Sequence, residues 1–149
     1  MTKILAAIVA IGLASGASAH DEGHGPKLTD SGKYGGIVSG VINLKDAKKG
    51  AKAELVYKAE LVRSPEGKVR VYLYDKEMKP LELAKIEPAA KGILGAKVKG
   101  KYKTDKFDLK LEGNTFIGDA PKAPAKPYNL DFQFKEPDRE LLTAFDNLD

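Results

Sequence analysis

The sequence predicts an all-β fold, an antiparallel β-sandwich or small barrel of about seven to eight strands. Three observations lead to this prediction. Apolar and polar residues alternate with a period of two along most of the chain, which is the pattern of half-buried strands. Turn residues separate these stretches at intervals of roughly 8 to 12 residues. The chain has 149 residues and no internal repeat, which suits one domain.

The clearest element is a hairpin over residues 53–75. The segments LVYKAEL and KVRVYLYD each place apolar residues at every second position. Between them lies Ser-Pro-Glu-Gly, in which Pro65 suits the second position of a type I turn and Gly67 the fourth. Tyr72 and Tyr74 fall on the polar face of the second strand. There they would cover a neighbouring element or serve as a docking surface.

A second hairpin is predicted in AKVKGKYKTDKFDLKLEG. A turn at Thr104-Asp105 would pair Tyr102 with Phe107, and the same register would set Lys101 opposite Asp108. Opposite charges in such cross-strand pairs contribute some tenths of a kcal/mol. The alternating lysines of the first strand are therefore interpreted as a solvated face, with an anionic polymer as the alternative partner.

Four further segments show strand-like alternation or apolar content: GGIVSGVINL, LELAKI, NTFIG and YNLDFQF. PKAPAKP places prolines three residues apart, which favours polyproline II and indicates a stiff loop or a covered sheet edge. Docking of this segment to an aromatic groove is the alternative. Near the chain end, apolar residues recur at helical spacing, which predicts a short C-terminal helix or else a frayed end; these are Leu141, Leu142, Phe145 and Leu148.

The first 19 residues are typical of a secretory signal peptide. Lys3 precedes an apolar run over residues 4–13, and Ala17-Ser18-Ala19 provides a small-residue cleavage site. The run is too short to span a bilayer, which needs about 20 apolar residues. No second such run follows, so we expect a periplasmic or secreted protein with no transmembrane segment after cleavage.

The remainder divides into two parts. Residues 20–36 are rich in Gly, Asp, Ser and Lys and are predicted to form a flexible arm. Residues 37–149 form the single predicted β domain. The chain contains no Cys, which excludes disulfide bonds and thiolate metal sites.

Charge and motifs argue against nucleic-acid binding and catalysis. The formal net charge is +4, with basic and acidic residues interspersed, which is not the footprint of a nucleic-acid partner. The sequence lacks G-x-S-x-G, a Walker loop and H-E-x-x-H. Paired carboxylates such as Glu54 and Glu60 lie on strand faces rich in Lys, which indicates surface charges. We therefore expect no enzyme.

Both histidines of the chain lie close to the predicted cleavage site. Cleavage after Ala19 would give His20 a free α-amine beside its imidazole, and His24 would add a third nitrogen. Asp21 or Glu22 could supply an oxygen. Nitrogen-rich tetragonal sites suit Cu(II). The ligands must be neutral to bind, so affinity should fall as the pH drops from roughly 8 to 6.

The segments YGGIVSG and LVYKAELVRSPEGKVRVYLYDKEMKPL resemble small periplasmic domains associated with bacterial heavy-metal efflux systems. The resemblance covers about residues 20–85. It rests on Gly35-Gly36, Val69 to Asp75 and Pro80-Leu81. It implies a β-sandwich and a link to copper or similar ions. The sequence departs from the family pattern at Tyr34, where the family has His.

Together these observations predict an exported, non-enzymatic binding protein that handles copper or a similar metal ion through its mature N-terminus. The alternative function is a cell-envelope interaction module that binds a protein or polymer through its sheet surface.

The copper hypothesis predicts a dependence on the exact N-terminus. Protein beginning at His20 should bind Cu(II) tightly and one to one, because the α-amine and imidazole chelate together. The same protein with one extra leading residue should bind much more weakly. Calorimetric titration of both proteins checks this, and equal weak binding in the two would contradict a metal site at the new terminus.

Overall fold

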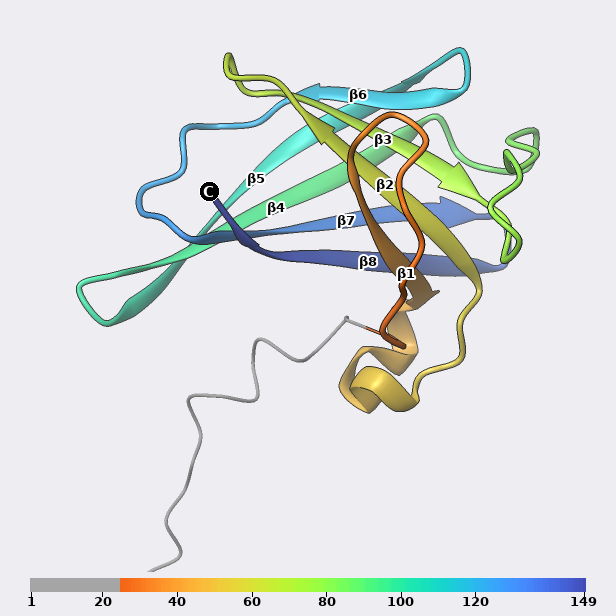
Figure 1. Ribbon diagram of the computed structural model, residues 1–149, viewed down its shortest axis with the longest axis horizontal. Coiled ribbons are helices and arrows are strands. Elements are labelled where there is room, and N and C mark those ends of the chain that lie inside the picture. Colours follow the sequence, from red (N-terminus) through yellow and green to blue (C-terminus); the bar gives the residue numbers. More distant parts are fainter. Residues whose placement is uncertain (1–24) are drawn as a thin grey trace, which may run out of the picture.

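The protein is a closed barrel of antiparallel strands. The computed structural model describes residues 25–149 (Figure 1). Neighbouring strands follow the order β1-β2-β3-β6-β5-β4-β7-β8, after which β8 pairs with β1. The strands are β1 (Ile37–Asn43), β2 (Tyr57–Arg63), β3 (Lys68–Tyr74), β4 (Ala89–Val98), β5 (Lys101–Glu112), β6 (Thr115–Asp119), β7 (Tyr128–Glu136) and β8 (Arg139–Leu148).

The predicted small barrel is confirmed, with eight strands among the described residues. One 3-10 element, η2 (Leu44–Lys52), connects β1 to β2 and contacts β1 and β8. Among residues 25–149, no helix combines the length and the hydropathy of a membrane-spanning segment. The predicted signal peptide, residues 1–19, lies outside the described residues.

The first predicted hairpin is confirmed. β2 and β3 pair in the register that sets Ala59 opposite Leu73 and Leu61 opposite Val71. All four side chains are buried in the barrel. The turn forms as expected, since the Gly67 amide donates to the Ser64 carbonyl and Gly67 takes a φ of 89°. Pro65 and Gly67 thus define the register of the whole β2–β3 pair.

The second hairpin exists, but its predicted turn is wrong. The chain turns at Lys99 and Gly100, where φ is 52° and 78°, instead of at Thr104-Asp105. Two residues with positive φ form the tight turn that matches strand twist. Tyr102 consequently pairs with Lys97 and not with Phe107.

Two glycines on β4 explain this register. A Cβ on Gly92 would lie 2.3 Å from the Phe107 ring, and a Cβ on Gly95 would lie 2.2 Å from the Tyr102 hydroxyl. The aromatic rings of β5 therefore lie directly over residues without side chains. Asp108 pairs with Lys91, with which it forms an ion pair, in place of the expected Lys101. The Lys97–Glu112 and Val98–Leu111 pairs that the predicted turn implied do not form either.

The predicted C-terminal helix is wrong, because residues 139–148 form strand β8. Leu141 and Phe145 face the barrel interior opposite Phe134 and Leu130. Leu142 points to the other face and is still only 4% exposed, because η2 packs against this side of β8. A strand buried on both faces carries consecutive apolar residues. Leu141 and Leu142 are such a pair, and together with Phe145 they imitate the spacing of a helix.

The other candidate strands have mixed outcomes. GGIVSGVINL, NTFIG and YNLDFQF contain β1, β6 and β7. LELAKI is not a strand and belongs to the connection between β3 and β4. Its apolar residues Leu81, Leu83 and Ile86 pack against the core nonetheless, which accounts for the alternation.

Phenylalanine side chains fill the middle of the barrel. Phe116 and Phe132 meet edge to face with ring centroids 5.2 Å apart, and Phe132 and Phe134 stack at 5.3 Å. At one end, Tyr57, Glu136 and Arg139 form a hydrogen-bonded cluster. An eight-stranded barrel is just wide enough to be filled by side chains or to hold one small ligand.

Two buried threonines give opposite predictions for stability. Thr143 faces the interior, is fully buried, and its hydroxyl has no hydrogen-bond partner among residues 25–149. Thr115 is also buried, but its hydroxyl donates to the Val71 carbonyl at 3.1 Å. Thr143→Val should raise the free energy of unfolding by about 1 kcal/mol and Thr115→Val should lower it by about the same amount. Urea unfolding measures both, and a loss of stability in Thr143→Val would contradict the assigned register.

Candidate ligand-binding mouth of the barrel

A segment before β1 packs over the outer face of β2 and β3. We call residues 25–36 the strap; it is the orange loop that runs up to β1 in Figure 1. A Cβ on Gly25 would lie 2.7 Å from Ile42, and the Asp30 carboxylate accepts a 2.8 Å bond from Lys58. The predicted flexible arm spanned residues 20–36. Residues 25–36 of it lie against the barrel, and residues 20–24 lie outside the described part.

The strap is held by the carboxylate of Glu60. Its Oε1 accepts hydrogen bonds from the Lys33 amide at 2.9 Å and the Tyr74 hydroxyl at 2.7 Å. Its Oε2 accepts from the amides of Tyr34 and Gly36 at 2.9 and 2.8 Å. Glu60 is fully buried, so the expectation that it is a surface charge is wrong.

These bonds keep the buried carboxylate ionised. Burial by itself raises the pKa of Glu60, but hydrogen bonds from Tyr74 and the three strap amides favour the charged form and outweigh it. The net pKa lies below the ordinary value for glutamate. Burial and the adjacent carboxylate raise the pKa of Tyr74 well above its usual range, so its hydroxyl remains a donor.

The two tyrosines of β3 are covered by the strap. Tyr72 stacks on Tyr34, with ring centroids 4.0 Å apart and planes 17° from parallel. Tyr74 is only 2% exposed. The hypothesis that Tyr72 and Tyr74 form an external docking pair is therefore wrong. Of the two roles considered, covering a neighbouring element is the one that this arrangement supports.

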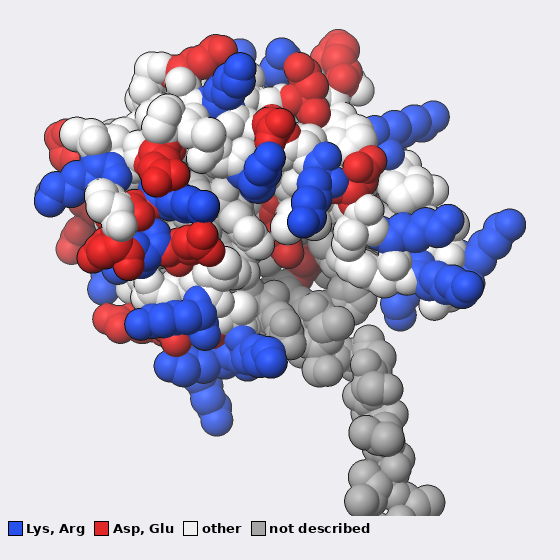
Figure 2. All heavy atoms as spheres, turned by 180° about the vertical axis from the view of Figure 1, so that it is seen from behind, with Lys and Arg blue, Asp and Glu red and all other residues white. Residues whose placement is uncertain are grey.

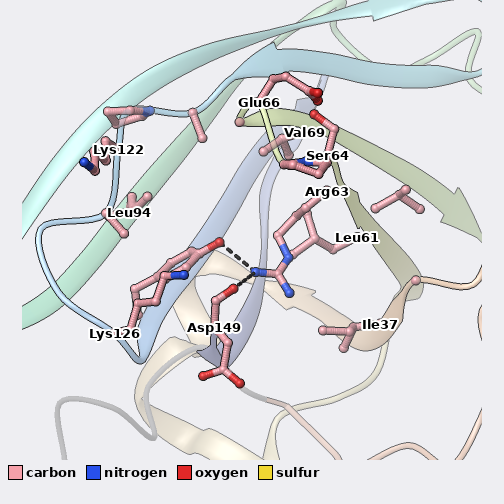
Figure 3. A pocket seen from close by; sticks show the side chains of 18 of the residues that line it. Ile37, Leu61, Arg63, Ser64, Glu66, Val69, Leu94, Lys122, Lys126 and Asp149 are labelled. Carbon is pink, nitrogen blue, oxygen red and sulfur yellow. Dashed lines mark hydrogen bonds between the residues drawn. The ribbon is translucent and has the colours of Figure 1, made fainter.

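The end of the strap forms part of the rim of a cavity of about 760 Å³ at the open end of the barrel (Figure 3). Gly35, Gly36 and Ile37 line it on one side. Its apolar walls are Leu61, Val69 and Leu94, each no more than 2% exposed. We call this cavity the mouth. The hydrogen bonds of Glu60 thus fix the position of strap residues that line the mouth.

Arg63 is the cation placed most centrally in the mouth (Figure 3). Its Nη1 donates to the Tyr128 hydroxyl at 2.7 Å and to a main-chain oxygen of Asp149 at 3.1 Å. Its guanidinium carbon lies 5.7 Å from the centre of the Tyr128 ring. No other hydrogen bond joins Nε or Nη2 to the described residues. The guanidinium is thus fixed in place while keeping donors for an anion.

The loop between β6 and β7 lies along the opposite side of the mouth. It contains the PKAPAKP segment, and Pro121, Lys122 and Lys126 line the cavity. The segment has no helix or strand, which confirms the loop interpretation. The mouth therefore combines three basic side chains, Arg63, Lys122 and Lys126, with the acidic Glu66 and Asp149.

The metal ligands predicted from the sequence, His20, His24, Asp21 and Glu22, lie outside the described residues. Within residues 25–149, no group of three or more His, Cys, Asp or Glu side chains is placed to hold a metal ion. The copper hypothesis therefore concerns a different part of the chain from the mouth.

Sequence reasoning missed both Glu60 and Arg63, for different reasons. Arg63 continues the inward-facing row of Ala59 and Leu61, so a cation on an apolar face was a visible signal. Glu60 lies on the polar face of β2, and only the fold brings the strap onto it. No pattern within the strand itself distinguishes it from the exposed Glu54.

The comparisons with known proteins add no relative. No protein-family model matches the sequence, and neither the curated proteins nor the solved structures searched gave a match.

Removing the charge of Glu60 should destabilise the protein in a pH-dependent way. In Glu60→Gln, the side-chain NH2 group replaces one of the two carboxylate oxygens and cannot accept the hydrogen bonds that this oxygen accepted. The free energy of unfolding should therefore fall by about 2–3 kcal/mol at neutral pH. Glu54→Gln, at an exposed site, is the matched control and should have little effect.

The lowered pKa gives the sign of the pH effect. The stabilisation is complete above the unfolded pKa of about 4.3 and disappears as the pH falls through the lower, folded value. The difference between wild type and Glu60→Gln should therefore shrink in acid. Urea unfolding across this range tests it, and a difference independent of pH would contradict the role given to the charge.

Proposed function

We propose that this chain is an exported, non-enzymatic binding protein whose mouth takes a small ligand with an apolar body and one anionic group. Export is proposed from the features of residues 1–19. The observation that carries the ligand site is Arg63, an arginine on the inward-facing row of a barrel strand, above the buried side chains of Leu61 and Val69.

The chemistry of the mouth selects this ligand class. Its apolar walls favour a ligand with a hydrocarbon or aromatic body, since removing apolar surface from water is favourable. A guanidinium presents a planar pair of donors that matches a carboxylate, and the Tyr128 contact orients it. Lys122 and Lys126 on the facing loop add positive charge to the same cavity. A cavity of about 760 Å³ has the size of small-molecule sites in other proteins.

Copper handling at His20 and His24, with Asp21 or Glu22, stays a separate proposal. It rests on the free amine that cleavage after Ala19 would create, and on no feature of the barrel. The two proposals are compatible, because they use different residues.

A pair of ligands with ten-carbon chains and head groups of opposite charge tests the mouth. Decanoate should bind at one site, and decyltrimethylammonium, with the same chain and opposite charge, should bind at least about tenfold more weakly. Arg63→Met should reduce decanoate affinity by about the same factor. Arg70→Met, on the exposed face of β3, is the control and should leave it unchanged.

Isothermal titration calorimetry measures these four affinities, which are those of the wild type for both ligands and those of the two variants for decanoate. Equal affinity for the two charges, or equal effects of the two arginine substitutions, would contradict the proposal. Absence of binding to either ligand at millimolar concentration would contradict it as well.

A further inference from the structure

The tip of the β4–β5 hairpin concentrates the net charge of the protein. We call residues 97–106 the lysine hairpin; it contains Lys97, Lys99, Lys101, Lys103 and Lys106 but only one acidic residue, Asp105. The whole chain has 25 basic and 21 acidic residues. Outside the lysine hairpin the chain therefore has 20 of each, and the formal charge of +4 resides in these ten residues.

The lysine hairpin projects beyond the rest of the barrel wall (Figure 1). β4 pairs with β7 only as far as Gly95, and β5 pairs with β6 only from Leu109 onward. Between these points the ribbon pairs with no third strand of the described residues, although the Tyr102 hydroxyl accepts a 3.4 Å hydrogen bond from the Asn129 amide of β7. All five of its lysines are exposed, and none forms an ion pair with a described residue. Figure 2 shows basic side chains gathered at the corresponding edge of the molecule.

Register places these charges on both faces of the ribbon. Lys97 and Lys106 lie on the face that continues the outside of the barrel, together with Tyr102. Lys101 and Lys103 lie on the opposite face. The positive potential therefore surrounds the tip, which suits an extended anionic surface better than a single anion held on one side.

The lysine hairpin and the mouth belong to one continuous surface. Lys126 lines a shallow hollow with Lys97 and Tyr102, and it also lines the mouth. Two large apolar side chains on this surface are unusually exposed, Tyr102 at 46% and Ile37, on the rim of the mouth, at 44%. The same end of the molecule thus combines cationic side chains with exposed aromatic and aliphatic groups.

We propose that this end of the barrel docks on an anionic lipid bilayer with the mouth facing the membrane. Lysines attract the negative headgroup layer, and each one near the surface strengthens binding several-fold. Tyrosine rings favour the membrane–water interface. A nucleic acid would use the lysines but would leave Ile37 and the apolar mouth without a role. The inference goes beyond the proposed ligand binding, which takes place in solution.

Vesicle co-sedimentation with the full chain tests the docking. The protein should bind vesicles of phosphatidylcholine containing phosphatidylglycerol, bind vesicles of phosphatidylcholine alone much more weakly, and dissociate as salt is added. Residues 4–13 are apolar and common to all variants, so differences between variants report on the barrel. Charge reversal at Lys99, Lys101 and Lys103 to Glu should lower the partition coefficient at least tenfold.

The matched control reverses the same number of charges elsewhere. Lys45, Lys48 and Lys52 on η2 are exposed, and their change to Glu should leave most of the binding intact. Substitution of the three hairpin lysines by Gln should give a smaller loss than Glu while avoiding new charge repulsion. Thermal unfolding of each variant verifies that it is folded.

Several results would overturn the docking proposal. Equal losses in the hairpin and η2 variants would mean that net charge alone is responsible. Unchanged vesicle binding together with aggregation of the hairpin variant would mean that the lysines only protect an exposed strand edge. Binding to polyphosphate but not to vesicles would indicate a different polyanion. Decanoate titration of the hairpin variant separates this outcome from the ligand site, because it should be unaffected.

Discussion

The arrangement of this end of the molecule depends on the hydrogen bonds that the carboxylate of Glu60 accepts. A buried charge is costly unless it is hydrogen-bonded, and here four donors surround it. Three of them are main-chain amides of the strap. The nearest cation-π contact, Lys33 over the Tyr74 ring at 5.4 Å, does not touch the carboxylate. The Tyr74 hydroxyl and three main-chain amides, and not a counter-ion, therefore stabilise the charge.

This arrangement restricts which residues the strap can contain. A Cβ on Gly32 would lie 2.3 Å from the Glu60 carboxylate, and a Cβ on Gly36 would lie 2.3 Å from the Leu61 carbonyl. Glycine at both positions lets the main chain approach closely enough to donate its amides. These two glycines thus give the main chain of the strap access to a buried acid.

The fold could be predicted to the level of class and of one hairpin, because these depend on local signals. Alternation with a period of two identified the strands, and Pro65 with Gly67 determined the β2–β3 turn. The β4–β5 turn could not be found in this way. Thr104-Asp105 and Lys99-Gly100 are both acceptable turns locally, and the choice is made by aromatic rings that need the space above Gly92 and Gly95.

Strand β8 shows a different limit of local reasoning. Its outer face is covered by η2, an element of nine residues whose sequence is polar and which contains no buried residue. Nothing in the sequence of η2 indicates that it covers a strand, so Leu142 beside Leu141 was interpreted as helical spacing. Glu60 could not be recognised as buried for the same reason, because the strap that covers it is distant in sequence. In both cases a residue on the outside of the barrel became buried because a segment distant in sequence lies over it.

The placement of charges relative to the packed core explains why both proposed binding surfaces lie at one end of the barrel. The interior is filled by Phe116, Phe132 and Phe134, and the far end is occupied by the cluster of Tyr57, Glu136 and Arg139. In that cluster the arginine is paired with a carboxylate. Arg63, at the mouth, is hydrogen-bonded to a hydroxyl and a main-chain oxygen instead. Arg63 thus lacks the side-chain ion pair that Arg139 makes with Glu136, and its Nε and Nη2 keep donors for the proposed ligand.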